Sequence, residues 1–382
     1  MRTIHFVETY LQLTETFVYN FIKSSATCGD VAVVSFSWKN LGNFPLDKGI
    51  KIFKLPAEIV ISKRKLYQIP WFLFDLVTGK KRWYRRLNQI IKEFRPDIVH
   101  CHFGTVGVDF AGFKRYYKSK IPFITSFYGY DASELPKRDL KYKDKLERIW
   151  EDATYILSEG PQMNKKLENL GAPSYKLRLS PIVVDSRNYP RKMSYRRSGQ
   201  LKFLLIGRFV EKKGFHLFLE SVGRIKDEIG DFSIQMIGGG IMKPVYLSII
   251  KKFNLEEHTD FLGPKSLQEC IQYMLDADVM IHPSVTSQSG DSEGGAPTIL
   301  IEAQLIGLPV ISSAHADIPF IMGYKDYLAK EGDVSDLIRL ILLFIRDSDI
   351  INKMEAGRSL VMEQHELNRS MHYKNILAEF NN

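Results

Sequence analysis

Cysteine is scarce in this chain, as are the long apolar runs and repeated segments that mark several classes of protein. The three cysteines, Cys28, Cys101 and Cys270, are widely spaced among apolar residues. An odd number at such spacing argues against a disulfide framework and indicates a reducing compartment, where the thiols fill core positions.

Membrane-spanning and secretory signals are missing as well. No apolar run approaches the roughly 20 residues that a helix needs to cross a bilayer. The first residues, MRTIHFVETYLQ, lack the extended apolar core and the small-residue cleavage site of a signal peptide. We therefore expect a protein that is made and kept in the cytoplasm.

Low-complexity tracts and repeats of solenoid period are also missing, which argues against a repeat architecture and against long disordered regions. What is present is typical of a globular protein, with 45% hydrophobic and 12% aromatic residues. The 382 residues exceed the size at which one hydrophobic core normally stops growing. Two domains are the natural expectation.

Positive charge is concentrated in one half of the sequence. Through Pro190 the chain has 31 Lys and Arg against 19 Asp and Glu, a balance of +12, whereas the remainder has 22 against 25, a balance of −3. Such asymmetry between halves points to an anionic partner for the first half.

The densest basic segment runs from Lys63 to Arg95, where cationic clusters flank the apolar run IPWFLF. Aromatic and apolar groups that enter the interface while cations meet the headgroups are typical of binding to an anionic membrane. A nucleic-acid stripe and a solvated basic face over ordinary core are the alternative interpretations. We expect an anionic membrane surface as the partner and no nucleic acid.

The first half alternates short β-rich runs with helical patterns, which favours a parallel sheet covered by helices on both faces. Strands are predicted at Ile4 to Val7, Val31 to Phe36, Ile50 to Leu55, Asp97 to Cys101, Phe123 to Phe127 and Thr154 to Leu157. Helices are predicted at Glu15 to Ser25, Trp83 to Phe94 and Val106 to Tyr117.

The second half repeats this pattern, with strands predicted at Leu201 to Ile206, Phe232 to Ile237, Thr259 to Leu262, Val279 to His282 and Pro309 to Ser312. The division that follows is a first Rossmann-like domain over residues 1–185, a linker over 186–200, a second over 201–365, and a terminal helix over 366–382 that packs back on the first domain. Ligands of such sheets bind beyond the carboxyl ends of the strands, in the cleft between the domains.

The segment from Asp291 to Val310, DSEGGAPTILIEAQLIGLPV, has the pattern of an anion site. Gly294 and Gly295 let the backbone approach a ligand closely, and Pro297 suits the first turn of a helix whose free N–H groups attract phosphate. Glu293 and Glu302 frame the site and can accept hydrogen bonds from sugar hydroxyls. An ordinary strand–loop–helix connection with solvated acids is the alternative.

A second charged loop, GRFVEKKGF, follows the strand that ends at Ile206. It places Arg208 and Lys213 five residues apart on a turn bounded by glycines. An Arg fork and a Lys point charge can together neutralise a diphosphate leaving group without a metal. A charged turn without ligand is again the alternative.

These motifs, with the Gly238 to Gly240 turn and IHPS at Ile281 to Ser284, resemble the retaining family 4 glycosyltransferases with the GT-B fold. LTETFV at Leu13 to Val18 is similar to the SETF segment of the branch that builds bacterial exopolysaccharide, capsule or O-antigen. VHCHFG at Val99 to Gly104 and TSFYGYD at Thr125 to Asp131 fall where that branch has its acceptor-side loops. The resemblance implies two Rossmann-like domains whose parallel sheets face each other across a cleft.

The resemblance also implies residue roles. Arg208, Lys213 and Glu293 would be catalytic, the two cations holding the donor diphosphate and Glu293 contacting the transferred sugar. The donor-binding set would be Gly207, Gly294, Gly295, Ala296, Pro297 and Glu302, with Glu302 on the nucleotide ribose. The family works without a bound metal or another cofactor, and its products keep the anomeric configuration of the donor.

Two features differ from the family pattern. The paired glutamates usually have seven residues between them, whereas Glu293 and Glu302 have eight. Many relatives have histidine where this chain has Tyr128. Because a tyrosine donates a hydrogen bond but does not titrate near neutrality, Tyr128 suits positioning rather than base catalysis.

On the acceptor side the candidates are Glu15, His102, Tyr128 and Asp131. Helix-dipole or loop-capping roles are the alternatives for Glu15 and Asp131. His100 and His102 share one face of a strand and Cys101 lies on the other, so no metal site is expected.

The sequence therefore predicts a glycosyltransferase peripheral to the inner face of the cell membrane. It would move a sugar from a nucleotide-diphosphate donor to a lipid-linked or oligosaccharide acceptor in surface polysaccharide synthesis. The alternatives are a GT-B nucleotide-sugar epimerase, or a non-catalytic protein that binds polyanions or membranes and keeps a vestigial donor pocket.

Overall fold

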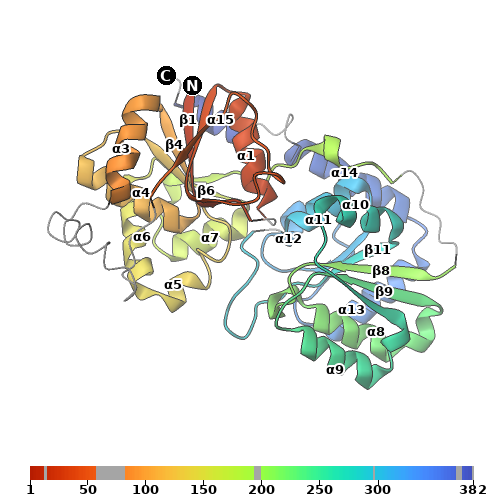
Figure 1. Ribbon diagram of the computed structural model, residues 1–382. Helices are drawn as coiled ribbons and strands as arrows, with labels where there is room; N and C mark the ends of the chain where they lie inside the picture. The colour runs from red at the N-terminus through yellow and green to blue at the C-terminus, as the bar shows by residue number, and fades with distance from the viewer. Residues whose placement is uncertain (13–14, 57–81, 193–198, 296, 367–371, 381–382) are drawn as a thin grey trace, which may run out of the picture.

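Two wholly parallel β-sheets organise the protein, in a computed structural model that describes residues 1–12, 15–56, 82–192, 199–295, 297–366 and 372–380 (Figure 1). The first sheet has seven strands in the order β3-β2-β1-β4-β5-β6-β7. These strands are β1 (Arg2–Tyr10), β2 (Asp30–Trp38), β3 (Lys51–Lys54), β4 (Ile98–His102), β5 (Phe123–Ser126), β6 (Tyr155–Ser158) and β7 (Leu177–Leu179).

Helices cover both faces of this sheet, as the interior strand β1 shows. Ile4 and Phe6 of β1 pack into a core with the helices on one side, whereas the intervening His5 contacts Ser25 of α1 on the other. The helices are α1 (Thr16–Ala26), α3 (Arg82–Phe94), α4 (Gly104–Tyr117), α5 (Leu135–Arg138), α6 (Leu140–Asp152) and α7 (Pro161–Asn169). Strands buried on both faces read as near-continuous apolar runs, which is how β2 (DVAVVSFSW) appears in the sequence.

The second sheet has six strands in the order β10-β9-β8-β11-β12-β13. They are β8 (Leu201–Ile206), β9 (Phe232–Ile237), β10 (Thr259–Gly263), β11 (Val279–His282), β12 (Val310–Ser313) and β13 (Leu328–Ala329). Its helices are α8 (Phe215–Ile229), α9 (Lys243–Phe253), α10 (Leu267–Asp276), α11 (Thr298–Ile306), α12 (Ile318–Ile321), α13 (Val334–Arg346) and α14 (Ile350–Gln364). A single hydrophobic core runs through this domain.

The predicted fold class is confirmed, since each domain is a Rossmann-like layer of parallel strands and helices. Short elements were missed. β7 has three residues and β13 has two, which are too few for an alternating apolar and polar pattern to be recognised. The predicted core role of cysteine fits Cys101 and Cys270, which are buried as free thiols.

The chain returns to the first domain at its end. α15 (His372–Ala378) lies beside α1 and β1 in Figure 1, although α14 belongs to the other lobe. Tyr373, Ile376 and Leu377 of α15 pack with Phe21 and with residues of β4, β5 and β6. The return passes through His365, whose Nδ1 lies 2.7 Å from the Ile182 carbonyl oxygen.

The basic segment from Lys63 to Arg95 is described only from Arg82 onward, where α3 begins. Residues 63–81 lie outside the described part, as do Leu13, Thr14 and residues 193–198 of the predicted linker. In α3 the apolar residues Trp83, Leu87, Ile90 and Phe94 recur at helical spacing and are buried. No helix in the described part of the chain is both long and apolar enough to cross a bilayer.

We predict that Leu377→Ala destabilises the first domain, because it removes a fully buried side chain from the contact between α15 and the sheet. The expected loss is about 2–4 kcal/mol. All four tryptophans of the sequence lie before Pro190, so urea unfolding followed by tryptophan fluorescence reports this domain. The exposed Asn375→Ala on the same helix is the control, and equal midpoints for the two variants would contradict the docking.

Candidate active site

The predicted donor residues gather in loops that follow strands of the second sheet. β8 leads into Gly207 and Arg208, then into the 3₁₀ turn Glu211–Lys213. β11 ends at His282 and is followed by the loop that carries Glu293 and the glycines. Neighbouring β8 and β11 are parallel, so their carboxyl ends bring both loops to one edge of the sheet.

A buried ion pair joins the two loops. Lys213 Nζ lies 2.8 Å from Glu293 Oε1, and both side chains are almost fully buried. Ser284 Oγ donates to the same oxygen at 3.1 Å. The backbone N–H of Glu293 donates to His315 Nε2 at 3.1 Å. Glu293 is therefore held from three directions.

The electrostatics keep Glu293 ionised. Burial alone raises its pKa, but the charge of Lys213, the His282 side chain and the charge of Lys212 together hold that pKa well below its usual range. Burial lowers the pKa of Lys213, and the Glu293 carboxylate opposes this shift. His282 stays neutral, because burial and the Lys213 charge lower its pKa to about 4.

Arg208 is exposed at the same edge and lies close enough to Lys213 for its charge to lower the Lys213 pKa. The Lys213 stem runs past Gly207, since a Cβ added at Gly207 would lie 3.7 Å from Lys213 Cδ and Cε. The structure thus brings Gly207, Arg208, Lys213 and Glu293 together. Two cations and one carboxylate then surround the space beyond β8 and β11.

The two glycines of the donor loop face the first domain. A Cβ added at Gly294 would lie 1.9 Å from the Cα of Gly129, which follows β5. A Cβ added at Gly295 would lie 2.0 Å from Glu159 Oε2, which follows β6. Gly129 itself has φ +120°, a conformation that favours glycine. The close approach that these glycines allow is therefore to the partner domain.

Pro297 occupies the N-cap position of α11, one residue before the helix begins. Ala296 lies outside the described residues. Glu302 lies inside α11, where it is buried and accepts a hydrogen bond from the Tyr189 hydroxyl at 2.7 Å. Burial raises the pKa of Glu302 to about 7, and the Tyr189 hydrogen bond opposes the shift.

Three further interdomain contacts involve residues that the sequence did not single out. Asp317, just before α12, accepts from the N–H groups of Gln162 and Met163 at 2.7 and 3.1 Å, and so caps the first turn of α7 from the other domain. Lys166 of α7 donates to Ser292 Oγ at 2.8 Å. A local pattern predicts a capping residue only within a few positions of its helix, and Asp317 lies about 155 positions away.

The acceptor-side candidates Glu15 and Asp131 organise loops. Glu15 is the N-cap residue of α1, and its carboxylate accepts from the Gln12 N–H at 2.9 Å. Asp131 is buried and accepts from the N–H groups of Gly104 and Tyr128 at 2.7 and 3.1 Å. Burial raises the pKa of Asp131 to about 6, against the effect of these hydrogen bonds.

His102 is fully buried, and its Nδ1 lies 2.7 Å from the hydroxyl of Tyr128 in the loop after β5. The ring of Tyr128 packs against Phe17 and Phe103. His5, which the sequence did not single out, lies with His100 and His102 in one buried cluster. His5 was missed because β1 and β4 pair only in the tertiary structure, with His5 opposite His100.

Two family models match this chain. Residues 190–358 match the model described as glycosyl transferases group 1, and residues 15–187 match the model described as glycosyltransferase family 4. The chain belongs to glycosyltransferase family 4. The resemblance drawn from the sequence motifs is thereby confirmed.

Similar sequences include named glycosyltransferases, and similar structures share the fold. The amylovoran biosynthesis glycosyltransferase AmsK of Erwinia amylovora is 27% identical over 288 residues, which cover 75% of this chain and 70% of AmsK. The putative colanic acid biosynthesis glycosyltransferase WcaL of Escherichia coli is 26% identical over 287 residues, covering 74% and 70%. Anabaena Alr3699/HepE, solved with UDP-glucose, superposes with a TM-score of 0.76 at 14% identity, covering 99% of this chain and 100% of that structure. The GT-B fold of the glycosyltransferase is confirmed.

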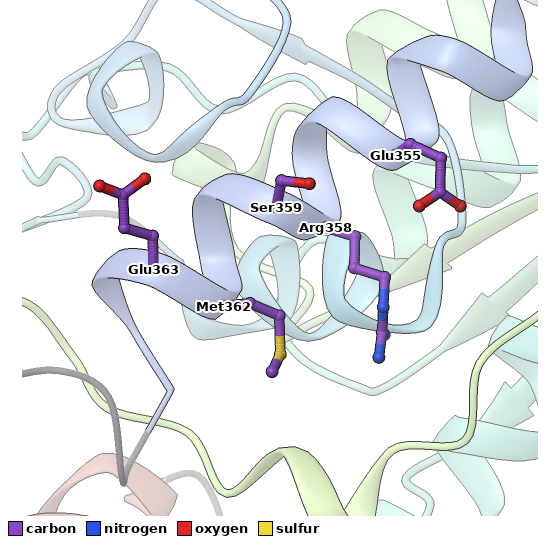
Figure 2. A pocket seen from close by; sticks show the side chains of 5 residues that line it. All are labelled: Glu355, Arg358, Ser359, Met362 and Glu363. Carbon is purple, nitrogen blue, oxygen red and sulfur yellow. The ribbon is translucent and has the colours of Figure 1, made fainter.

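A groove of about 450 Å³ on this glycosyltransferase lies away from the site, along α14. Figure 2 shows the side chains that line it, Glu355, Arg358, Ser359, Met362 and Glu363, all on that one helix. Glu355 forms an ion pair with Arg191 of the segment that connects the domains. The groove therefore belongs to the connection between domains, and it contains none of the candidate site residues.

We predict that Glu302→Gln stabilises the protein at pH 8 much more than at pH 5. The folded pKa of Glu302, about 7, lies above its ordinary value of 4.5. Protonated Glu302 therefore stabilises the fold fully below pH 4.5, and this contribution is lost as the pH rises through about 7. The change between the two pH values should be on the order of 2–3 kcal/mol.

Urea unfolding followed by circular dichroism at both pH values measures this change. The glutamine keeps an oxygen to accept from Tyr189, so the hydrogen bond is preserved. If the free energy of unfolding differed between variant and wild type by the same amount at pH 5 and pH 8, Glu302 would not titrate in this range.

Proposed function

We propose that this glycosyltransferase moves a sugar from a nucleotide-diphosphate donor to a lipid-linked glycan, with retention of anomeric configuration and without a bound metal. The product would be a bacterial surface polysaccharide, such as an exopolysaccharide, capsule or O-antigen. AmsK and WcaL, whose names refer to amylovoran and colanic acid, support this class of product. Arg208 and Lys213 would take the catalytic role that a metal has in other enzymes of this chemistry.

The observation that carries the proposal is the Lys213–Glu293 pair beside Arg208. An ammonium has three donors, and Lys213 directs one to Glu293 and one to His282 Nε2, which leaves the third for a phosphate oxygen. Two cations there would disperse charge on a leaving diphosphate as the sugar becomes oxocarbenium-like. Ionised Glu293 is an acceptor only, and so would bind hydroxyls of the transferred sugar.

The acceptor hydroxyl would then attack from the face that the diphosphate leaves, and it would lose its proton to a leaving phosphate oxygen. This route requires no titrating base in the protein. It is consistent with a tyrosine at position 128, since burial raises the pKa of Tyr128 well above its ordinary value and keeps the phenol protonated. The donor residues lie in the second domain, and the acceptor candidates Glu15, His102, Tyr128 and Asp131 in the first.

The basic first domain would sit on the anionic inner face of the cell membrane, where a lipid-linked acceptor is found. A groove of about 450 Å³ supports this surface, since it is lined by Lys54, Leu55, Pro56, Arg82, Arg85, Arg86 and Gln89. Four cations around one groove attract phosphate headgroups. The rest of the proposed surface, residues 63–81, lies outside the described part of the chain.

We predict that Lys213→Ala removes most turnover, because it withdraws charge from the leaving diphosphate and leaves the buried Glu293 carboxylate without its cation. The assay begins with calorimetric titration of UDP, GDP, ADP and their common sugar conjugates in EDTA, and then measures transfer with whichever donor binds. Arg208→Ala should weaken binding of the same nucleotide by roughly 10-fold or more.

Lys265→Ala, which breaks an exposed pair with Glu269 in the same domain, is the control and should leave binding and turnover unchanged. Near-normal turnover of Lys213→Ala would remove Lys213 from the mechanism. Vesicle binding by a chain that binds no nucleotide sugar would instead favour a non-catalytic membrane-binding protein.

We predict that neutralising Lys80, Lys81, Arg82, Arg85 and Arg86 releases the protein from anionic vesicles while sparing donor binding. Each cation near an anionic surface contributes about 1 kcal/mol, so the loss should exceed about 100-fold in a vesicle sedimentation assay. The matched control neutralises five exposed lysines of the same domain, Lys118, Lys120, Lys141, Lys143 and Lys145. Equal losses in the two variants would show that only net charge matters.

A further inference from the structure

One short turn of the second domain contacts both Glu293 and the first domain. It consists of His315, Ala316 and Asp317, which follow β12 and lead into α12. Figure 1 shows α12 on the side of the second domain that faces the first. His315 is 3% exposed and Asp317 is 1% exposed. The turn is therefore buried where the loop that carries Glu293 meets the other domain.

His315 holds the backbone of Glu293. The Glu293 N–H donates to His315 Nε2 at 3.1 Å. A nitrogen that accepts must have a free lone pair, so His315 is neutral in this contact and carries its proton on Nδ1. That nitrogen lies 2.9 Å from Glu331 Oε2, and Glu331 Oε1 accepts from the Thr286 N–H at 2.6 Å. His315 and Glu331 thus hold two points of the loop that carries Glu293.

Asp317 holds the first domain. Helix α7 begins after Gly160, which has no side chain to cap the helix, and the Asp317 carboxylate accepts from two N–H groups of its first turn at 2.7 and 3.1 Å. A Cβ added at Gly160 would lie 2.3 Å from Asp317 Cγ, so a glycine leaves room for the carboxylate. One turn further along α7, Lys166 donates to Ser292 at 2.8 Å. The same helix therefore contacts the turn and the residue before Glu293.

The backbone of the turn is strained between these two contacts. Ala316 has φ +46°, in the left-handed region that alanine adopts only at a cost. Unlike asparagine, alanine has no polar side chain that could hydrogen-bond locally to offset this cost. Such a conformation persists only where the surrounding structure holds it. Here the contacts of His315 and Asp317 lie on either side of Ala316, so loss of one would let the turn relax and weaken the other.

We propose that His315 is a positioning residue for Glu293, and that the strained turn makes this positioning depend on the Asp317 contact with the first domain. Lys213 and Ser284 hold the Glu293 carboxylate, whereas His315 fixes its backbone. Glu293 is then aligned for the transferred sugar only while the first domain is docked. The contact of Glu293 with the sugar rests on the proposed function.

Hydrogen exchange of the peptide that contains Glu293, measured by mass spectrometry on the full chain, tests the first contact without any substrate. His315→Leu removes the acceptor and should raise exchange at the Glu293 amide by roughly 10-fold or more. His315→Gln should keep exchange slow, because its side-chain oxygen can replace Nε2 as the acceptor. Equal exchange in the two variants would overturn the role of His315.

Asp317→Ala tests the dependence on the first domain. It removes the cap of α7 and should raise exchange both in residues 162–166 and at Glu293. The matched control is Asp333→Ala, which removes an aspartate cap from α13 of the same domain and should change neither. A rise confined to α7 would overturn the dependence. Asp317→Asn keeps one acceptor oxygen, and replaces the alanine variant with a smaller expected rise if that variant does not fold.

A double variant shows whether Asp317 acts through the turn. In the His315→Leu background, Asp317→Ala should add little further exchange at Glu293, because the contact through which it acts is already lost. Additive increases would mean that the domain contact reaches Glu293 by another route, and would overturn the part assigned to the turn.

Calorimetry separates positioning from general damage to the site. The probes are the one of UDP, GDP and ADP that binds, and its common sugar conjugates. Since Arg208 and Lys213 would hold the diphosphate and Glu293 the sugar, His315→Leu should leave binding of the bare diphosphate unchanged. It should weaken binding of the conjugate by roughly 10-fold, and His315→Gln should restore it. Equal losses for the diphosphate and the conjugate would overturn the positioning role.

The two kinds of readout also distinguish this inference from the proposed function. If exchange behaves as expected while no nucleotide sugar binds, the positioning of Glu293 stands and the proposed function fails. If sugar is transferred but Glu293 in His315→Leu exchanges as slowly as in the wild type, the proposed function stands and the role of His315 fails.

Discussion

The buried Lys213–Glu293 ion pair is the interaction on which the site depends. A carboxylate removed from water is stable only with a cation and hydrogen-bond donors around it, and Glu293 has Lys213 and the Ser284 hydroxyl. Because Lys213 follows β8 and Glu293 follows β11, the pair ties two loops of one sheet together. The donor loop is thereby held in a shape that presents Gly294 and Gly295 to the other domain.

That presentation makes the site a product of both domains. Gly129 meets Gly294, Glu159 meets Gly295, and Asp317 caps α7 of the first domain. The first two contacts involve glycine backbones that approach the other domain too closely for a larger side chain. The third is made by the Asp317 carboxylate, which would otherwise be buried without a partner. The contact between the domains and the shape of the loop that carries Glu293 therefore depend on the same residues.

The two domains meet their polar requirements in opposite ways. The second domain buries opposite charges side by side, which suits binding of a charged diphosphate. The first domain buries a cluster of hydroxyl and imidazole groups, which gives every nitrogen of His5, His100 and His102 a hydrogen-bond partner. The Tyr128 hydroxyl is thereby held by His102, whose pKa burial lowers well below its ordinary value.

The sequence by itself determined the fold class and identified the loops that bring Arg208, Lys213 and Glu293 together. Alternating β and α patterns identified two parallel sheets, and Arg208, Lys213 and Glu293 stood in short motifs because their loops follow directly after strands. Only the tertiary structure decided the rest. Hydrogen bonds join His5 to Ser25 and Ser25 to Tyr373 although up to 368 positions separate them, and Asp317 caps a helix of the other domain. Local spacing carries no information on such contacts, because strand pairing and domain packing bring these residues together.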